Sequence, residues 1–303
     1  MVSENKTSDG FTSTFITARD GLKLHVRSYG RRAAPGLPVV CLPGLARTSA
    51  DFHALAQALS RDGAHPRRVI ALDYRGRGQS DYDRNPANYS FHVELADILA
   101  VLAACDAMPA LFVGTSRGGI LAMLLATVRP AAIAGVVLND IGPVIEPKGL
   151  MRIKSYVGKL PQPNSFEEGA EILRRLFSAQ FPKLTAEDWL LNARCTFKQA
   201  GDRLVPDYDV KLAKTLEGAD FEKPLPPLWK EFDALAGVPA MVIRGANSDI
   251  LSAATVEAMR ARRSELDVIE VADQGHAPLL AEPDVMTRIV AFAKKCEAAT
   301  HVD

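Results

Sequence analysis

The segment that most constrains the fold is residues 111–123, where a short apolar run meets a Gly-x-Ser-x-Gly turn and then a run of helix-forming residues. This order predicts a strand that turns sharply into a helix with Ser116 at the bend, the layout of a nucleophile elbow. Strand and helix pass closely there, so the residues two before and two after the serine must be small. Gly114 and Gly118 occupy those positions, and Gly119 gives further room. The flanking patterns favour this interpretation over a surface Gly/Ser turn.

Short apolar strands alternate with amphipathic helices on both sides of this segment. The pattern predicts a β-hairpin over residues 11–29, with its turn at Asp20-Gly21. Further strands are predicted at residues 39–42, 69–72, 111–113, 134–139, 239–245 and 268–271, and helices at 51–59, 89–104, 253–263 and 284–299. Such alternation is typical of an α/β fold with a mostly parallel central sheet and helices on both faces.

Residues 144–232 interrupt this alternation. Prolines separate short helical pieces, and no apolar run there has the pattern of a buried strand. Aromatic side chains gather in the same region: Tyr156, Phe166, Phe177, Phe181, Trp189, Phe197, Tyr208, Phe221, Trp229 and Phe232. We predict a helical lid, inserted after the sixth strand between core segments 1–143 and 233–303, whose inner face lines an apolar pocket. A small helical subdomain with its own core is the simpler alternative, and both can hold.

The composition argues against several classes of partner. Lys plus Arg and Asp plus Glu both number 36, and this balance gives no support for binding nucleic acid or an anionic membrane. Four cysteines lie far apart, which favours reduced, mostly buried thiols over disulfides or a metal site: Cys41, Cys105, Cys195 and Cys296. No apolar run approaches the ~20 residues that span a bilayer, and the polar N-terminus has no apolar signal segment. We therefore expect a cytoplasmic location.

A serine hydroxyl needs a base within hydrogen-bond reach to become a nucleophile. We choose His276, which follows a glycine in a loop after a late strand, because sites in open α/β sheets form at the carboxyl ends of strands. The other histidines are in a predicted strand, at helix starts, in a turn or in the C-terminal tail: His25, His53, His92, His65 and His301. The base needs a carboxylate to hold it, and Asp249, after the strand at 239–245, is the first choice. Asp140, after the strand at 134–139, is the second.

Backbone N–H groups must also face the oxyanion that forms when the serine attacks a carbonyl. Arg117, next to Ser116 at the start of the predicted helix, supplies one, and Leu45, after the strand at 39–42, is the expected second. The loop 73–81 has Gly-x-Gly but lacks a third glycine and a Lys-Ser/Thr pair, so a structural loop is favoured over a phosphate site. Arginines in these loops are expected to form salt bridges, with substrate carboxylate binding as the alternative: Arg47, Arg75 and Arg77.

Five segments, in this order, resemble the α/β-hydrolase superfamily along nearly the whole chain: residues 42–45, 73–80, 114–119, 244–249 and 275–278. The resemblance is greatest to bacterial hydrolases of the lactonase and carboxylesterase type. It implies the α/β-hydrolase fold and a triad in the chain order Ser116, Asp249, His276. One departure is Pro43-Gly44, where many relatives have His-Gly, so a histidine side-chain contribution to the oxyanion loop is absent.

These residues predict a serine hydrolase that cleaves carboxylic esters through an acyl-enzyme, without metal or organic cofactor. The aromatic residues of the predicted lid indicate a small-molecule ester with an apolar portion. An enol-lactonase, a C–C bond hydrolase of aromatic degradation and a cofactor-free haloperoxidase use the same triad, so they stay open. Dehalogenases and epoxide hydrolases have an aspartate at the elbow, which Ser116 argues against. A non-catalytic ligand-binding protein on the same fold is the alternative from another class.

Overall fold

The structure is a computed structural model of the 303-residue chain that describes residues 3–6, 10–217 and 225–300. Nine of its described strands form one sheet in the order β1-β2-β3-β5-β4-β6-β7-β10-β11. They are β1 (Ser3–Lys6), β2 (Thr12–Thr17), β3 (Lys23–Tyr29), β4 (Val39–Leu42), β5 (Val69–Leu72), β6 (Ala110–Thr115), β7 (Ile133–Asn139), β10 (Ala240–Gly245) and β11 (Asp267–Val271). Strands β5, β4, β6, β7, β10 and β11 run parallel, whereas β1, β2 and β3 add an antiparallel edge. The mostly parallel sheet is confirmed; β1 was not predicted.

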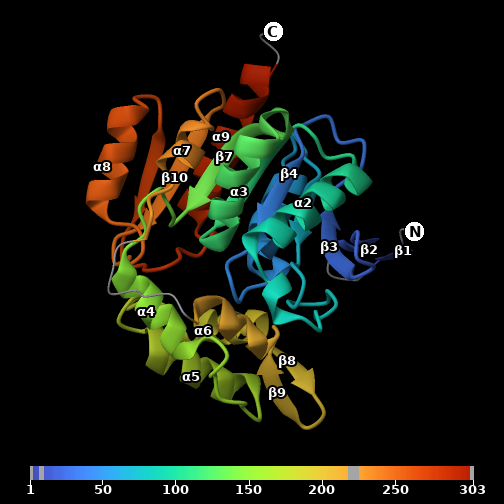
Figure 1. Cartoon of the computed structure of the whole chain (residues 1–303), viewed down its shortest axis with the longest axis vertical. Coiled ribbons are helices and arrows are strands. Elements are labelled where there is room, and N and C mark those ends of the chain that lie inside the picture. Colours follow the sequence, from blue (N-terminus) through green and yellow to red (C-terminus); the bar gives the residue numbers. More distant parts are fainter. Residues whose placement is uncertain (1–2, 7–9, 218–224, 301–303) are drawn as a thin grey trace.

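Helices cover both faces of this sheet (Figure 1). They are α1 (His53–Ser60), α2 (Phe91–Cys105), α3 (Arg117–Val128), α7 (Trp229–Asp233), α8 (Ala253–Arg262) and α9 (Pro283–Thr300). Ser90 accepts a hydrogen bond from the Val93 N–H and so caps α2, since a side-chain acceptor satisfies a free N–H of the first turn. The predicted helix over residues 51–59 is a 3₁₀ turn, η1 (Ser49–Phe52), that continues into α1.

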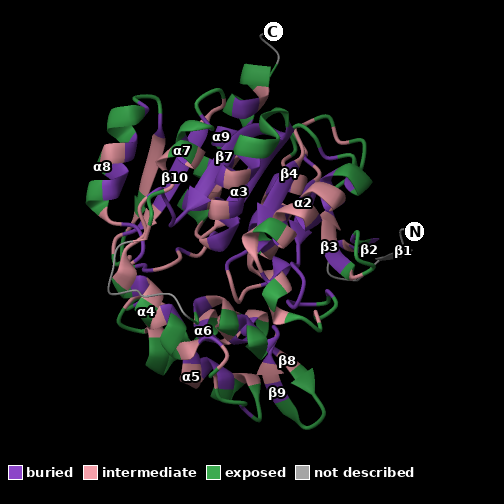
Figure 2. Cartoon of the chain, in the orientation of Figure 1, coloured by how far each residue is buried: buried purple, intermediate pink, exposed green. Residues whose placement is uncertain are grey.

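Alternate residues of each parallel strand enter different hydrophobic cores. Val40 and Leu42 of β4 pack with α2 and α3, whereas Val39 and Cys41 pack with α1 and α9. The two-residue period explains this separation, because successive side chains of a strand point to opposite faces. Strands buried on both faces read as continuous apolar runs, and Figure 2 shows the central strands as the most buried part of the chain.

Most of the segment between β7 and β10, from α4 to β9, gathers at one end of the sheet, at the bottom of Figure 1, whereas α7 lies back beside β10. The elements of this segment are α4 (Pro147–Tyr156), α5 (Phe166–Phe177), α6 (Ala186–Thr196), β8 (Phe197–Ala200), β9 (Arg203–Pro206), η4 (Val210–Leu216) and α7. The β8–β9 hairpin corrects the expectation of helices alone. It lacked a strand signal because most of its residues are exposed or part-exposed. Phe221 lies outside the described residues.

This segment has two kinds of packing. Helices α5 and α6 and the β8–β9 hairpin share a small core of their own, with Trp189 and Phe197 inside it. By contrast, Ile153 of α4, Leu212 of η4 and Phe232 of α7 join the core of the main sheet. The lid boundaries 144–232 therefore stay a prediction, with α7 packed against α3 rather than against the lid's own core. Among the described residues, no helix is long and apolar enough to cross a membrane.

Candidate active site

Ser116 lies in a sharp turn between β6 and α3, with backbone angles φ 52° and ψ −113°. This left-handed φ is unfavourable for a residue with a side chain, so the surrounding packing must hold it. A Cβ atom on Gly114 would lie 2.6 Å from the Gly118 carbonyl carbon, and one on Gly118 would lie 2.0 Å from the Leu42 carbonyl oxygen. The prediction that both positions must lack a side chain is confirmed. The glycines let β4, β6 and α3 approach closely enough to hold the bend.

The structure brings Ser116, His276 and Asp140 together. His276 Nε2 lies 2.9 Å from Ser116 Oγ, and His276 Nδ1 lies 2.8 Å from Asp140 Oδ2. An ionised carboxylate only accepts, so the proton of a neutral imidazole is on Nδ1 and Nε2 is free to accept from the serine hydroxyl. This is the hydrogen-bond pattern that a general base next to a serine nucleophile requires.

Three donors hold the Asp140 carboxylate, which is fully buried. The Gly245 N–H donates to Oδ1 at 2.8 Å, and Oδ2 accepts from the Ser248 hydroxyl at 2.6 Å as well as from His276. A buried carboxylate needs such partners, because burying polar oxygens without hydrogen bonds is unfavourable. Ser248 was missed by sequence reasoning; its place in a short polar turn after the strand at 239–245 was the available signal.

Asp249 does not contact His276, which corrects the first choice made from the sequence. Its carboxylate accepts from Arg152 Nε at 2.7 Å and from Arg152 Nη2 at 2.8 Å. Burial alone would raise the pKa of Asp249, but hydrogen bonds and charge from Arg152, with a hydrogen bond from Gln180, lower it below its ordinary value. Asp140, the second choice, occupies the position beside His276.

The order of the strands in the sheet explains why Asp140, and not Asp249, lies beside His276. β7 lies between β6 and β10, so Asp140, the residue after β7, comes next to the residue that ends β6. Asp249 lies four residues beyond β10, where its backbone oxygen accepts from the Gly149 N–H of α4 at 3.0 Å. The chain there has turned toward the predicted lid, and Ser248 is the residue that faces the sheet.

The two predicted oxyanion donors come from loops that adjoin Ser116. Arg117 is the first residue of α3, where an N–H has no partner within the helix. Leu45 follows Gly44, and a Cβ on Gly44 would lie 3.9 Å from Ser116 Cβ, so this loop passes directly beside the serine. Their role toward an oxyanion stays a prediction.

The Arg117 side chain turns away from the serine and into a buried charge cluster. Its Nε donates to Glu94 Oε2 at 2.6 Å, its guanidinium stacks on Phe91 at 4.0 Å from the ring centre, and Arg77 lies 2.7 Å from the other oxygen of Glu94. Glu94 and Arg77 are fully buried. The cluster ties the start of α3 to α2 and thereby fixes the backbone of Arg117.

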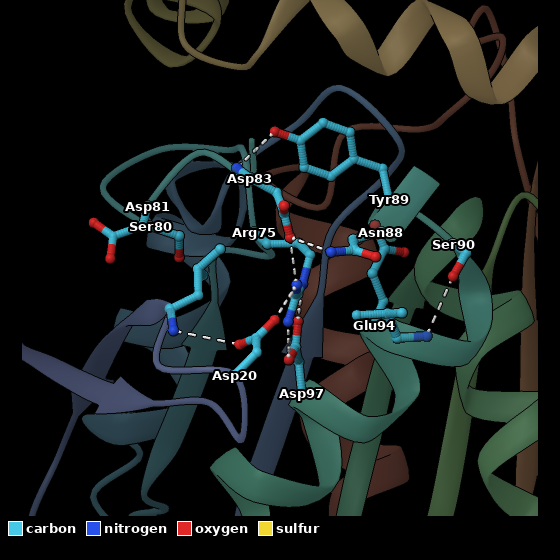
Figure 3. Close-up of polar contacts among 12 residues, drawn as sticks. Asp20, Arg75, Ser80, Asp81, Asp83, Asn88, Tyr89, Ser90, Glu94 and Asp97 are labelled. Atoms are coloured by element: carbon cyan, nitrogen blue, oxygen red, sulfur yellow. Dashed lines mark hydrogen bonds and ion pairs between the residues drawn. The ribbon is translucent and has the colours of Figure 1, made fainter. Parts of the chain in front are cut away.

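The loop 73–81 is held by similar pairs. Figure 3 shows Arg75 between three carboxylates: it donates to Asp97 at 2.7 Å from two nitrogens, to Asp83 at 2.7 Å and to Asp20 at 2.8 Å. Arg75 is buried, so its charge is used for packing this loop against α2 and the β2–β3 turn. Arg47 likewise pairs with Asp51 and donates from Nη1 to Thr196 of α6 at 2.6 Å.

A second Ser–His–Asp arrangement lies in the same molecule. Ser13 Oγ is 2.5 Å from His25 Nε2, and His25 Nδ1 is 2.7 Å from Asp73 Oδ2. All three side chains are buried, between β2, β3 and the end of β5. The sequence analysis placed His25 in a strand and did not choose it, and the structure keeps it away from Ser116.

Metal ligation has no candidate group in the part of the chain that the structure describes, since no three His, Cys, Asp or Glu side chains are arranged to hold an ion. Of the four cysteines, Cys41, Cys105 and Cys296 are buried thiols, and Cys195 is part-exposed. Burial raises the pKa of Cys296 to about 12, which keeps this thiol protonated at neutral pH.

Comparisons with known proteins agree with this fold. A 3-hydroxybutyrate-oligomer hydrolase from Cupriavidus necator is 34% identical over 283 residues, which cover 89% of this chain and 93% of that protein. The crystal structure of an alpha/beta hydrolase from Novosphingobium aromaticivorans matches with a TM-score of 0.85 and 36% identity, over 94% of this chain and 99% of that one. A putative hydrolase from Rickettsia typhi matches with a TM-score of 0.80 and 25% identity, over 90% and 92% of the two chains.

The family model matches from β4 to α9, over residues 39–289, and therefore includes every residue of the candidate site. The expected fold is confirmed, and the chain belongs to the alpha/beta hydrolase family.

Proposed function

We propose that this protein is a serine hydrolase that cleaves carboxylic esters through an acyl-enzyme intermediate. The observation that carries the proposal is the hydrogen-bonded line from Ser116 through His276 to Asp140, with Ser116 at a strained turn. Ser116 is only part-buried, so a substrate carbonyl can approach its hydroxyl. The substrate class that we propose is a short oligoester of a hydroxy acid, because such an oligomer is the substrate named for the relative from Cupriavidus necator.

The reaction has two halves. In the first, Ser116 Oγ attacks the ester carbonyl while its proton passes to His276 Nε2, and Asp140 stabilises the imidazolium. The N–H groups of Arg117 and Leu45 hold the oxyanion, a contribution of about 3–4 kcal/mol for each donor. Collapse of the tetrahedral intermediate breaks the bond to the alcohol, which leaves with the proton from His276.

In the second half, His276 takes a proton from water, and the resulting hydroxide attacks the acyl group on Ser116. The second tetrahedral intermediate uses the same oxyanion donors. Its collapse breaks the bond between the acyl carbon and Ser116 Oγ, returns the proton to the serine and releases the acid. The proton transfers between Ser116 and His276 use a contact that the resting site already has. We further propose that residues 144–232 act as a lid over this site.

A fluorophosphonate probe tests the proposal, because it labels only an activated serine. We expect labelling at Ser116, located by peptide mass spectrometry, together with hydrolysis of aryl esters and 3-hydroxybutyrate oligomers. Ser13 supplies an internal control, since its buried hydroxyl should stay unlabelled although it also bonds a histidine. An unlabelled protein without esterase activity would favour the ligand-binding alternative. Activity confined to lactones or to C–C bonds would favour the alternative enzymes.

A further inference from the structure

Asn139 is the last residue of β7 and lies directly beside the nucleophile elbow. It pairs with Thr115 in the register of β6 and β7, and its carbonyl oxygen accepts from the Ser116 N–H at 3.0 Å. The next residue along the chain is Asp140, whose carboxylate bonds His276. The backbone of Asn139 therefore joins the nucleophile to the residue that holds the base.

The side chain of Asn139 makes a second connection, between the elbow and the loop that carries the base. Its Nδ2 donates to Thr115 Oγ1 at 3.1 Å and to the Pro278 carbonyl oxygen at 3.0 Å. A carbonyl oxygen can only accept, so the nitrogen of the amide, and not its oxygen, faces Pro278. An amide nitrogen carries two hydrogens, and one is available for each of these acceptors.

This amide is the polar exception in an apolar strand. The other residues of β7, at 133–138, are apolar or glycine and are buried, and Asn139 itself is only 1% exposed. A buried polar side chain is unfavourable unless it is hydrogen-bonded. Each of its two partners lies one or two residues from the nucleophile or the base. The bonds that satisfy the amide therefore also connect those two reacting groups.

The loop that carries His276 must cross much of the sheet to reach the nucleophile. It follows β11, at the edge of the sheet, and β10 and β7 lie between that strand and β6. The loop is held on both sides of the histidine. Before it, the Gln274 carbonyl oxygen accepts from the Asn247 N–H at 2.9 Å. After it, the Pro278 carbonyl accepts from Asn139, which is the contact that comes from the strand next to the elbow.

We propose that Asn139 is a positioning residue that sets the distance between His276 Nε2 and Ser116 Oγ. By holding the Pro278 carbonyl at the end of β7, its amide keeps the imidazole 2.9 Å from the serine hydroxyl, within the range that proton transfer requires. Asn139 takes no part in a covalent step. The inference rests on the proposed ester hydrolysis.

The test measures hydrolysis of a neutral aryl ester and the rate of labelling by a fluorophosphonate probe. In Asn139→Ala, kcat should fall about ten- to one-hundredfold, with KM within about threefold, because displacing reacting groups by about 1 Å can cost this much. The second-order rate constant of labelling should fall as well, because it also depends on the activation of Ser116 by His276. Asn139→Leu keeps the branched shape without the donor and should lose as much. Asn88→Ala removes an amide that donates to Asp83, and as the matched control it should keep kcat within about twofold.

Thr115→Val separates the two hydrogen bonds of the amide. It removes the acceptor at the elbow and leaves the bond to Pro278, so kcat should fall less than about threefold. An equal loss in Thr115→Val and Asn139→Ala would place the whole effect at the elbow and would overturn the inference.

Urea unfolding distinguishes positioning from a purely structural role. We expect the loss of kcat under conditions where both Asn139 variants are folded. A structural contact alone would lower the urea midpoint of these variants and leave kcat of the folded protein unchanged, and this result would also overturn the inference, while ester hydrolysis stood. If the unmodified protein hydrolysed no ester and Ser116 stayed unlabelled, the ester-hydrolase proposal itself would fail.

Discussion

Two hydrogen-bonded Ser–His–Asp sets in this molecule have nearly the same hydrogen bonds and very different surroundings. Ser13, His25 and Asp73 are joined by contacts of 2.5 and 2.7 Å, and Ser116, His276 and Asp140 by contacts of 2.9 and 2.8 Å. The first serine lies within β2, in extended backbone paired on both sides, and all three of its residues are buried. The second lies at a strained turn, before the free N–H groups of a helix start and at the carboxyl edge of the parallel strands.

From this difference we infer that hydrogen-bond geometry alone does not make a nucleophile. A reactive serine also needs access for the carbonyl and unpaired donors for the oxyanion, and only the elbow offers both. The Ser13 set instead satisfies buried polar groups, since Asp73 also accepts from the backbone N–H groups of Ser49 and Gln79. It holds β3 against the loop that follows β5.

The strongest test of this comparison removes each serine in turn. Ser116→Ala should lower kcat on an aryl ester by on the order of 10⁶, because a triad without its nucleophile loses nearly all of its advantage. Ser13→Ala should leave kcat within about twofold and lower the free energy of unfolding by about 1–3 kcal/mol, since His25 loses a buried partner. Steady-state kinetics and urea unfolding measure the two effects. A large loss of kcat in Ser13→Ala would contradict the separation of roles.

Substitution of each candidate acid tests in the same way whether Asp140 or Asp249 supports His276. Asp140→Asn should lower kcat by on the order of 10⁴, because the amide favours the wrong tautomer of His276. Asp249→Asn should keep kcat on a neutral aryl ester within about tenfold, since that carboxylate bonds Arg152 rather than the histidine. The opposite ranking of the two variants would restore the assignment made from chain order.

Asp73 of the buried Ser13–His25–Asp73 set gives a prediction about how the stability of the fold depends on pH. Burial would raise the pKa of Asp73, but its hydrogen bonds with His25 and Ser49 outweigh this and lower it. A lowered pKa in the folded state stabilises the fold above the ordinary aspartate value of about 4, and this contribution is lost as the pH falls toward the lowered pKa. Asp73→Asn should therefore cost about 1–3 kcal/mol at pH 7 and less below about pH 4. Urea unfolding at several pH values gives the difference, and a constant difference would argue against an ionised Asp73.

The smallest expected effect concerns Ser248, which donates to Asp140 at 2.6 Å. Ser248→Ala should lower kcat about tenfold with little change in KM, because one hydrogen bond to a charged group is lost and no substrate contact is removed. Ser60→Ala, at the end of α1, is a control far from the site in the chain and should leave both constants near their original values. Unchanged kcat in Ser248→Ala would mean that the Gly245 N–H suffices to hold the acid.

Much of the fold followed from local patterns. The parallel strands around residues 39–42, 69–72 and 134–139 were predicted because each is buried on both faces and reads as an uninterrupted apolar run. The hairpin β8–β9 and the edge strand β1 were not, because short strands away from the main core carry little hydrophobic pattern. Ser116 and His276 were placed together by one argument, that loops after parallel strands meet at one edge of the sheet.

What the sequence by itself determined is the bend at Ser116, because the close approach of β4, β6 and α3 demands glycine at positions 114 and 118. Which carboxylate meets His276 depended on strand order: β7 lies between β6 and β10, and this brings Asp140 beside the histidine and leaves Asp249 to Arg152. Ser13 and His25 meet within the local β2–β3 hairpin, whereas Asp73 reaches His25 because β5 pairs with β3. Spacing along the chain reports local conformation, whereas partners 100 or more residues apart are fixed by how the strands are ordered, and only tertiary structure decides that.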